Sequence, residues 1–180
     1  YADVRLGVAY EAAVSWSKRF GLLDAQPGGG FGPKTEMTRS QVVNVLWRLV
    51  DRPAGRTPTS FTDVPASAWY LPSLNWAVGQ GVTTGFPDGS FHPAASVKRG
   101  QFVTMLWNLA GRPTGSPPAG FTDVRAGDKL SPALDWAAAQ GLVSPYPDGT
   151  FRPKKALTRQ QVVAILFDLA STKSAWAQFP

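Results

Sequence analysis

Two kinds of apolar segment alternate along the chain, and both have the spacing of helices. In the stretch KRGQFVTMLWNLA (98–110), apolar side chains recur every three or four residues, which predicts a helix with a wide apolar face. The stretch WYLPSLNWAVGQ (69–80) predicts a shorter helix, with Pro72 in its first turn and Gly81 as its C-terminal stop. The loop GFPDGSFHP (85–93) lies between them, and its Pro-Asp-Gly is typical of a tight turn. The segment 61–110 therefore predicts helix, loop and helix.

This pattern recurs with a period of 60 residues, and no gap is needed to align the three copies. The copies open with YADV at 1, FTDV at 61 and FTDV at 121. Equivalent positions hold the same residue in every copy: Trp16, Trp76 and Trp136; Gly21, Gly81 and Gly141; Phe31, Phe91 and Phe151; Pro33, Pro93 and Pro153; Arg39, Arg99 and Arg159; Gln41, Gln101 and Gln161. We therefore predict three repeats, at 1–60, 61–120 and 121–180.

One such repeat cannot bury its apolar face alone, whereas three copies can pack their second helices together. We expect a mainly α fold, in which three helix-loop-helix repeats form a closed, pseudo-threefold helical bundle and together make one structural domain. An open solenoid is the alternative architecture.

Three features together resemble the S-layer homology (SLH) domain family over essentially the whole chain. They are the FTDV opening, the GFPDGSFHP loop and the TRxQ helix start. The resemblance implies three tandem repeats that form a pseudo-trimer of helices. It also implies non-covalent attachment of an exported bacterial protein to secondary cell-wall polysaccharide, which is often pyruvate-modified. The usual TRAE of the family stands here as TRSQ, KRGQ and TRQQ, so glutamine replaces the acid in every copy.

The second helices begin with Arg39, Arg99 and Arg159, although the partial positive charge of a helix N-terminus disfavours a cation there. Threonine and glutamine form a capping box around the first and third arginine, and Lys98 replaces the threonine in the second copy. The arginines are either solvated or salt-bridged, or they bind an anion beside exposed backbone N–H groups. We favour anion binding, and we expect Arg→Ala at 99 or 159 to leave the melting temperature within a few degrees.

Five aspartates recur with the repeats. Asp3, Asp63 and Asp123 follow the aromatic opening of each copy, where they either make turn or cap hydrogen bonds or accept sugar hydroxyls in a groove between copies. Asp88 and Asp148 lie in the Pro-Asp-Gly turn, where a structural role is favoured. The first copy reads PGGG in that turn and lacks the acid.

Aromatic residues are the remaining candidates for a glycan site. Trp16, Trp76 and Trp136 recur on the first helices, and core packing is their default role. Trp69 stands where the resemblance implies a groove tryptophan. Aromatic rings stack on the C–H surfaces of sugars, so a partly exposed Trp69 or Trp76 suits a glycan site.

Composition narrows the function classes. The 180 residues include no cysteine, which excludes disulfides and thiolate metal sites, and the net charge of +6 suits an acidic partner. No apolar stretch reaches the length of about 18 to 20 residues that a membrane span needs. There is no signal peptide, and a chain that starts at Tyr1 is expected to be a mature product or a fragment. One histidine, His92, without a nucleophile and base set argues against an enzyme, and we expect no cofactor and no metal.

We therefore expect an extracellular module at the bacterial cell wall, which binds an anionic, pyruvylated polysaccharide in grooves between repeats. The alternative is a structural self-assembly or protein-docking domain. Positive charge is spread over the copies, so no nucleic-acid partner is expected, and neither is membrane insertion. Attachment to a larger exported protein fits this role. The expected ligand-binding residues are Arg39, Arg99, Arg159, Asp3, Asp63, Asp123, Asp88, Asp148, Trp69 and Trp76.

The copies also predict an order of filling. The third copy keeps Thr158, Arg159, Gln161 and Asp148 together, and the second gains a lysine at 98. Sites with Arg99 or Arg159 are therefore expected to fill before any site that uses the glycine-rich loop 27–30, which must be ordered on binding.

Overall fold

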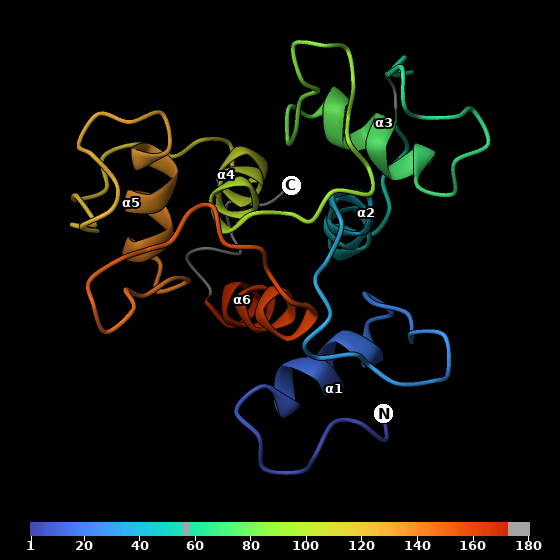
Figure 1. Cartoon of the computed structure of the whole chain (residues 1–180), viewed down its shortest axis with the longest axis horizontal. Coiled ribbons are helices and arrows are strands. Elements are labelled where there is room, and N and C mark those ends of the chain that lie inside the picture. The colour runs from blue at the N-terminus through green and yellow to red at the C-terminus, as the bar shows by residue number, and fades with distance from the viewer. Residues whose placement is uncertain (56–57, 173–180) are drawn as a thin grey trace.

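The computed structural model describes residues 1–55 and 58–172, and these residues form six helices without a named strand (Figure 1). The helices are α1 (Glu11–Arg19), α2 (Arg39–Leu49), α3 (Leu71–Gly79), α4 (Arg99–Leu109), α5 (Ser131–Ala139) and α6 (Arg159–Ser171). Each 60-residue unit contributes one short and one longer helix, which confirms the predicted helix, loop and helix.

The six helices form two rings around a pseudo-threefold axis. Helices α2, α4 and α6 surround the axis, and α1, α3 and α5 lie outside them (Figure 1). Each outer helix packs on the inner helix of the preceding repeat: α3 on α2, α5 on α4, and α1 on α6. The contact between α1 and α6 joins the first repeat to the third, so the array is closed. The predicted pseudo-threefold bundle is confirmed, and the open solenoid is excluded.

Backbone hydrogen bonds join the three repeats at the axis. The Met37 N–H donates to the Leu157 carbonyl at 3.0 Å, the Val97 N–H to the Met37 carbonyl at 2.8 Å, and the Leu157 N–H to the Val97 carbonyl at 3.1 Å. All three side chains are fully buried. These bonds, called here the axial ring, tie each repeat directly to both others.

The core lies between the two rings of helices. Its largest contributions come from equivalent positions of the inner helices and from one phenylalanine in each loop, all at most 1% exposed: Val42, Val43 and Leu46; Phe102, Val103 and Leu106; Val162, Val163 and Leu166; Phe31, Phe91 and Phe151. Burying one such side chain contributes about 1.5 to 3 kcal/mol. The wide apolar face predicted for the second helices is thus the face that builds the core.

Helix ends follow the predicted chemistry. Pro72 lies at the start of α3, and Gly81 beyond its end has φ of 66°, which glycine adopts without strain. At α2, Thr38 Oγ1 accepts from the Gln41 N–H at 3.3 Å, and Gln41 Oε1 accepts from the Thr38 N–H at 3.0 Å. At α4, Gln101 still accepts from the N–H of Lys98, but a lysine side chain has no acceptor to return the bond.

None of the helices in the described part of the chain is both long and apolar enough to span a membrane.

Candidate functional site

Three grooves lie where the repeats meet, and each is built by the same elements. The wall of each groove is the segment that follows an outer helix, together with the first turns of the inner helix of that repeat. The preceding repeat supplies an arginine. Groove 1 comprises 22–27, α2 and Arg159; groove 2 comprises 82–86, α4 and Arg39; groove 3 comprises 142–146, α6 and Arg99. Their volumes are about 280, 530 and 300 Å³.

The three arginines cross from one repeat to the next. Each Nε donates to a loop phenylalanine carbonyl: Arg39 to Phe91 at 2.8 Å, Arg99 to Phe151 at 2.9 Å and Arg159 to Phe31 at 2.6 Å. Arg39 is 4% exposed and Arg159 2%, while Arg99 is half-buried. Burial lowers the pKa of all three guanidinium groups. Arginines that join repeats in this way are part of the fold, so the expected near-neutral effect of Arg159→Ala on stability conflicts with its burial.

The guanidinium groups also reach the grooves. That of Arg39 lies over the rings of Phe86 and Phe91, 4.8 and 4.6 Å from their centroids, and Arg159 lies 4.9 Å from that of Phe31. Within the described residues, no buried side-chain nitrogen or oxygen lacks a hydrogen-bond partner. The outer guanidinium nitrogens that make no such bond therefore keep some solvent-accessible surface, although Arg39 and Arg159 are almost fully buried as whole residues. Each groove thus presents one guanidinium group that is fixed by hydrogen bonds to the protein and still has nitrogen donors for a ligand.

The helix N-termini beside the arginines are not open to a ligand. The backbone N–H groups of Arg39 and Ser40 donate to the carbonyls of Ala95 (2.9 Å) and Pro93 (3.1 Å). The other inner helices bond in the same way, Arg99 and Gly100 to Lys155 and Pro153, and Arg159 and Gln160 to Thr35 and Pro33. The predicted exposed N–H groups are therefore wrong, because the loop of the next repeat already uses them. Its carbonyls also offset the unfavourable position of a cation at a helix start.

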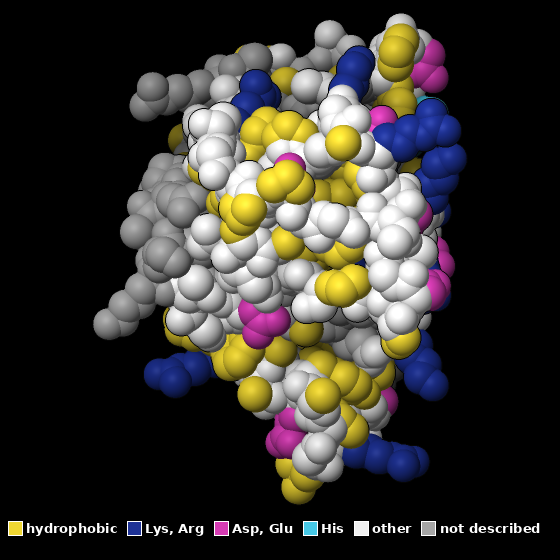
Figure 2. All heavy atoms as spheres, turned by 90° about the vertical axis from the view of Figure 1, so that its left-hand side faces the viewer, with side chains coloured by type: hydrophobic (Ala, Val, Ile, Leu, Met, Phe, Trp, Pro, Cys, Tyr) yellow, Lys and Arg dark blue, Asp and Glu magenta, His cyan; other side chains and the backbone are white. Residues whose placement is uncertain are grey.

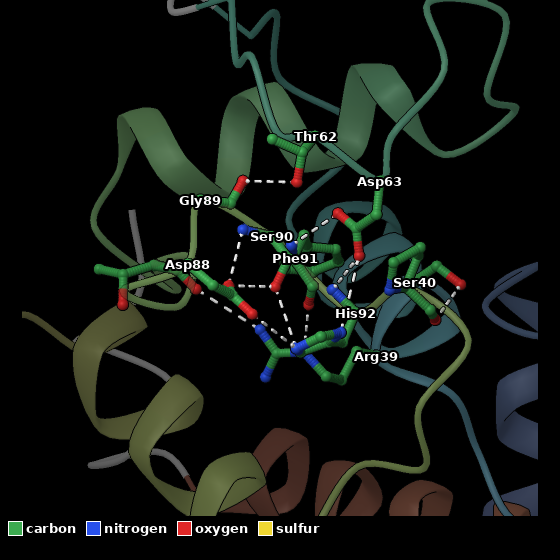
Figure 3. A network of polar contacts seen from close by, with 11 residues as sticks. Arg39, Ser40, Thr62, Asp63, Asp88, Gly89, Ser90, Phe91 and His92 are labelled. Atoms are coloured by element: carbon green, nitrogen blue, oxygen red, sulfur yellow. Dashed lines mark hydrogen bonds and ion pairs between the residues drawn. The ribbon is translucent and has the colours of Figure 1, made fainter.

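Asp63 binds the backbone of its own repeat (Figure 3). Its carboxylate accepts from the N–H of Phe91 at 2.8 Å and of His92 at 2.7 Å. His92 has φ of 55°, the left-handed conformation in which two successive N–H groups can meet one carboxylate. Asp3 and Asp123 make the equivalent pairs of bonds, and those from Phe31 and Gly32 lower the pKa of Asp3.

The turn aspartates are likewise engaged within their own loops. Asp88 accepts from the N–H and hydroxyl of Ser90, at 3.0 and 2.5 Å. Asp148 accepts from Thr150 and pairs with Arg152 at 2.9 Å, and these two residues hold the pKa of Asp148 far below its usual range. The linings of grooves 1 to 3 include none of the five predicted aspartates. The structure thus supplies a structural role for each of them.

The two candidate tryptophans have opposite environments. Trp69 is 63% exposed and lines groove 1 beside Gln41, Asn44 and Arg159. Trp76 is 3% exposed and lies in the core, the default role of the first-helix tryptophans, so it does not meet the condition of partial exposure for a glycan contact. The buried indole leaves no face for a sugar.

The residues around His92 superficially resemble a catalytic triad (Figure 3). Ser90 Oγ lies 3.0 Å from His92 Nε2, and His92 Nδ1 lies 3.7 Å from an Asp63 oxygen. The second distance is too long for a hydrogen bond, and the Ser90 hydroxyl also bonds Asp88. The cluster therefore stabilises a turn and does not activate a nucleophile. Groups of three or more His, Cys, Asp or Glu suited to a metal ion do not occur among the described residues.

The sequence analysis did not single out two residues that line the grooves. Asp24 lines groove 1, pairs with Arg48 at 2.8 Å, and offers its carbonyl to Arg159 Nη2 at 2.6 Å. Lys129 lines groove 2, at the position that Trp69 holds one repeat earlier. The sequence could have indicated Lys129, because the 60-residue period aligns it with Trp69, which was a candidate site residue.

The structure also changes which residues share a groove. Arg159 lies in groove 1, whereas Gln161 lies in groove 3 with Arg99. The predicted order of filling depends on a set of four residues, which the structure does not bring together. Arg159 and Gln161 line different grooves, and Thr158 and Asp148 line none of the three. The reason is that each arginine acts on the following repeat and not on its own.

The comparisons with known proteins agree with the repeat structure. The profile of the S-layer homology domain matches residues 1–43, 60–103 and 120–163. The chain is 29% identical over 155 residues to a cellulosome-anchoring protein of Acetivibrio thermocellus, over 81% of this chain and 34% of that protein. It is 27% identical over 159 residues to cell surface glycoprotein 1 of the same organism, over 80% of this chain and 7% of the relative.

Other relatives include an S-layer protein of Bacillus thuringiensis subsp. finitimus, 26% identical over 73% of this chain and 15% of the relative. The chain thus spans about a third or less of the length of these proteins. The three profile matches cover most of the chain, one in each repeat, and they coincide with the loop and inner-helix start that build the grooves. The chain belongs to the S-layer homology domain family, as three tandem repeats.

Proposed function

We propose that this chain is a non-covalent anchor that binds an anionic, pyruvylated cell-wall polysaccharide in the grooves between repeats. The observation that carries the proposal is the arginine held in each groove with outer guanidinium nitrogens in contact with solvent. The family indicates a cell-surface location, and relatives named for anchoring and S-layer roles support the function. Because the chain covers only part of those relatives, we also infer attachment to a larger exported protein.

The geometry of Arg159 suits a carboxylate such as that of a pyruvate substituent. Its Nε and Nη2 already bond the carbonyls of Phe31 and Asp24, and its plane lies over the Phe31 ring. The side chain is therefore fixed before a ligand arrives, and little rotamer entropy is lost on binding. A charge-assisted bond from the remaining nitrogen would then be formed in a partly desolvated groove.

Groove 1 has the most complete set for a sugar. Trp69 offers an exposed ring for stacking, and Gln41 and Asn44 offer amides for hydroxyl groups. Asp24 lies in the same groove, but Arg48 pairs with it and reduces its repulsion of an anion. We therefore infer that groove 1 is the principal carbohydrate groove, although it adjoins the PGGG loop.

We propose no catalytic role for this chain. One relative, an endoglucanase of Bacillus sp. (strain KSM-635), is 30% identical over 58% of this chain, but only 11% of that enzyme is matched. We also infer no nucleic-acid partner. On the face seen in Figure 2, on the α5 side, the Lys and Arg side chains lie mainly around the rim and form no continuous stripe.

The test is co-sedimentation with purified wall polysaccharide, before and after mild acid removes its pyruvate groups. We expect wild type to bind the native polymer, to lose binding to the acid-treated polymer, and to be weakened by Trp69→Ala. Phe20→Ala is the matched control, because Phe20 is 56% exposed and lies outside all three grooves. Equal binding to both polymers contradicts the role of the pyruvate. Self-association without binding to either polymer favours the structural self-assembly alternative.

A further inference from the structure

Groove 2 differs from the other two grooves in its cations. Besides Arg39 it is lined by Lys98, Lys129 and Lys154. The equivalent positions are Thr38, Trp69 and Ala94 around groove 1, and Thr158, Ala9 and Lys34 around groove 3. The surplus of positive charge at this groove comes from substitutions in two repeats, because Lys98 precedes α4 whereas Lys129 and Lys154 belong to the third repeat.

Nothing acidic in the groove lining offsets these charges. The lining of groove 2 includes no aspartate or glutamate, whereas groove 1 includes Asp24. The nearest acid in sequence, Asp128, accepts from the Arg125 N–H at 3.3 Å and does not line the groove. Across the described residues, the three lysines form no ion pair within 4.0 Å. All three are exposed, so their ammonium groups can move onto a ligand.

The groove is also the largest of the three, at about 530 Å³. Its neutral wall carries Thr83, Thr84, Gln101, Thr104 and Asn108, which can bond hydroxyl groups. Its one aromatic lining residue, Phe86, is half-buried and has the Arg39 guanidinium 4.8 Å from its ring centroid, whereas groove 1 offers the exposed ring of Trp69. The chemistry of groove 2 thus favours a flexible, hydroxylated and highly charged ligand over a stacked sugar ring.

We propose that groove 2 is a subsite for a phosphodiester-linked polyol chain, a ligand with one negative charge per unit. This deepens the proposed anchoring function and rests on it. A single carboxylate neutralises one of four cations, whereas a short run of phosphodiesters can meet all of them. Lysine pairs with phosphate as a point charge, whereas Arg39 keeps its Nε on the Phe91 carbonyl and can meet a phosphate only through its outer nitrogens.

The test is calorimetry with a synthetic glycerol-phosphate hexamer as the probe. The test variant is Lys98→Thr/Lys129→Ala/Lys154→Ala, which puts in residues that the chain itself carries at equivalent positions of its other repeats. The loss of one exposed ion pair weakens affinity by up to about fivefold. The triple variant should therefore bind the hexamer at least about tenfold more weakly than wild type does. The wild-type affinity should fall steeply with added salt, and that of the variant less so.

The charge-matched control is Arg5→Ala/Lys18→Ala/Arg19→Ala, which removes three exposed cations outside the three grooves. It should bind the hexamer within about twofold of wild type. Equal binding by wild type and the test variant overturns the proposal. So does a hexagalacturonate or a six-nucleotide thymidine strand that binds as tightly with the same lysine dependence, because the groove would then not select phosphodiester-linked polyols.

The probe contains neither sugar nor pyruvate, so its outcome is separate from that of the proposed function. Trp69→Ala should leave hexamer binding unchanged while it weakens binding to the wall polysaccharide. Melting curves of every variant check that the fold is retained.

Discussion

Replacing Arg159 by alanine should destabilise the protein as well as weaken its groove. Arg159 is 2% exposed and donates at 2.6 Å to the carbonyls of both Phe31 and Asp24. A hydrogen bond from a charged group contributes about 1.5 to 3 kcal/mol. Relief of the desolvation cost of a buried cation offsets part of this loss. We expect the free energy of unfolding to fall by about 3 kcal/mol, an order-of-magnitude figure built on those contributions.

The assay is urea denaturation at neutral pH, paired with thermal melting. For a chain of this length a loss of 1 kcal/mol lowers the melting temperature by about 2 to 4 °C, so a drop of about 6 to 12 °C is expected. Arg99→Ala should lose about half as much free energy, because Arg99 is half-buried and makes one such bond. Arg159→Lys keeps the charge but not the fork, and should fall between wild type and Arg159→Ala.

Exposed Arg5 supplies the control, since Arg5→Ala should stay within about 0.5 kcal/mol of wild type. If Arg159→Ala costs less than about 1 kcal/mol, the reasoning from burial and bond count is wrong. A larger loss for Arg99→Ala than for Arg159→Ala would refute it in the same way.

Four further predictions concern the fold. Asp63→Asn should lower the free energy of unfolding by about 1 to 2 kcal/mol in urea, because an NH2 group, which donates, replaces one of the two oxygens that accept backbone N–H groups. Lys98→Thr should raise it by about 0.5 to 1 kcal/mol, since it completes the capping box of α4. Trp76→Ala should cost about 3 to 5 kcal/mol, and a change under 1 kcal/mol would contradict its place in the core. The fold lowers the pKa values of Asp3 and Asp63, so their ionised carboxylates contribute stability above about pH 4, where these groups are also ionised in the unfolded chain. This contribution is lost as the carboxylates are protonated, so the melting temperature should fall as the pH is lowered below about 4.

The repeat period and the apolar spacing were enough to predict the helices, whereas they favoured a closed ring without excluding an open solenoid. The second helix predicted at 98–110 is observed as Arg99–Leu109, and the first predicted at 69–80 as Leu71–Gly79. These elements are predictable because apolar periodicity and the Pro and Gly signals are local in sequence. The contact between α1 and α6 decides between the two, and no local signal in the sequence shows it.

The partners of the groove residues could not be predicted in the same way. A period shows that Arg39 and Arg99 are equivalent, but it does not show which repeat each one touches. Their partners are carbonyl oxygens, as at Phe91 and Phe151, and any residue type supplies a carbonyl. Asp63 was ambiguous for the same reason, because the N–H groups it accepts from leave no mark in the sequence. The sequence also could not show that the Trp76 ring is buried and the Trp69 ring exposed, because it does not record the direction in which a ring points.

The axial ring has a mechanical consequence for a protein under load. A pull on α6 strains both hydrogen bonds of Leu157 at once, one to each of the other two repeats. The same pull loads the contact of α1 with α6 and the bonds of Arg159 to the first repeat. These contacts must shear together, whereas the units of an open array can peel away one by one. The closed topology therefore makes the array yield as a single body, and we expect a single rupture event instead of three steps when it is stretched between α1 and α6.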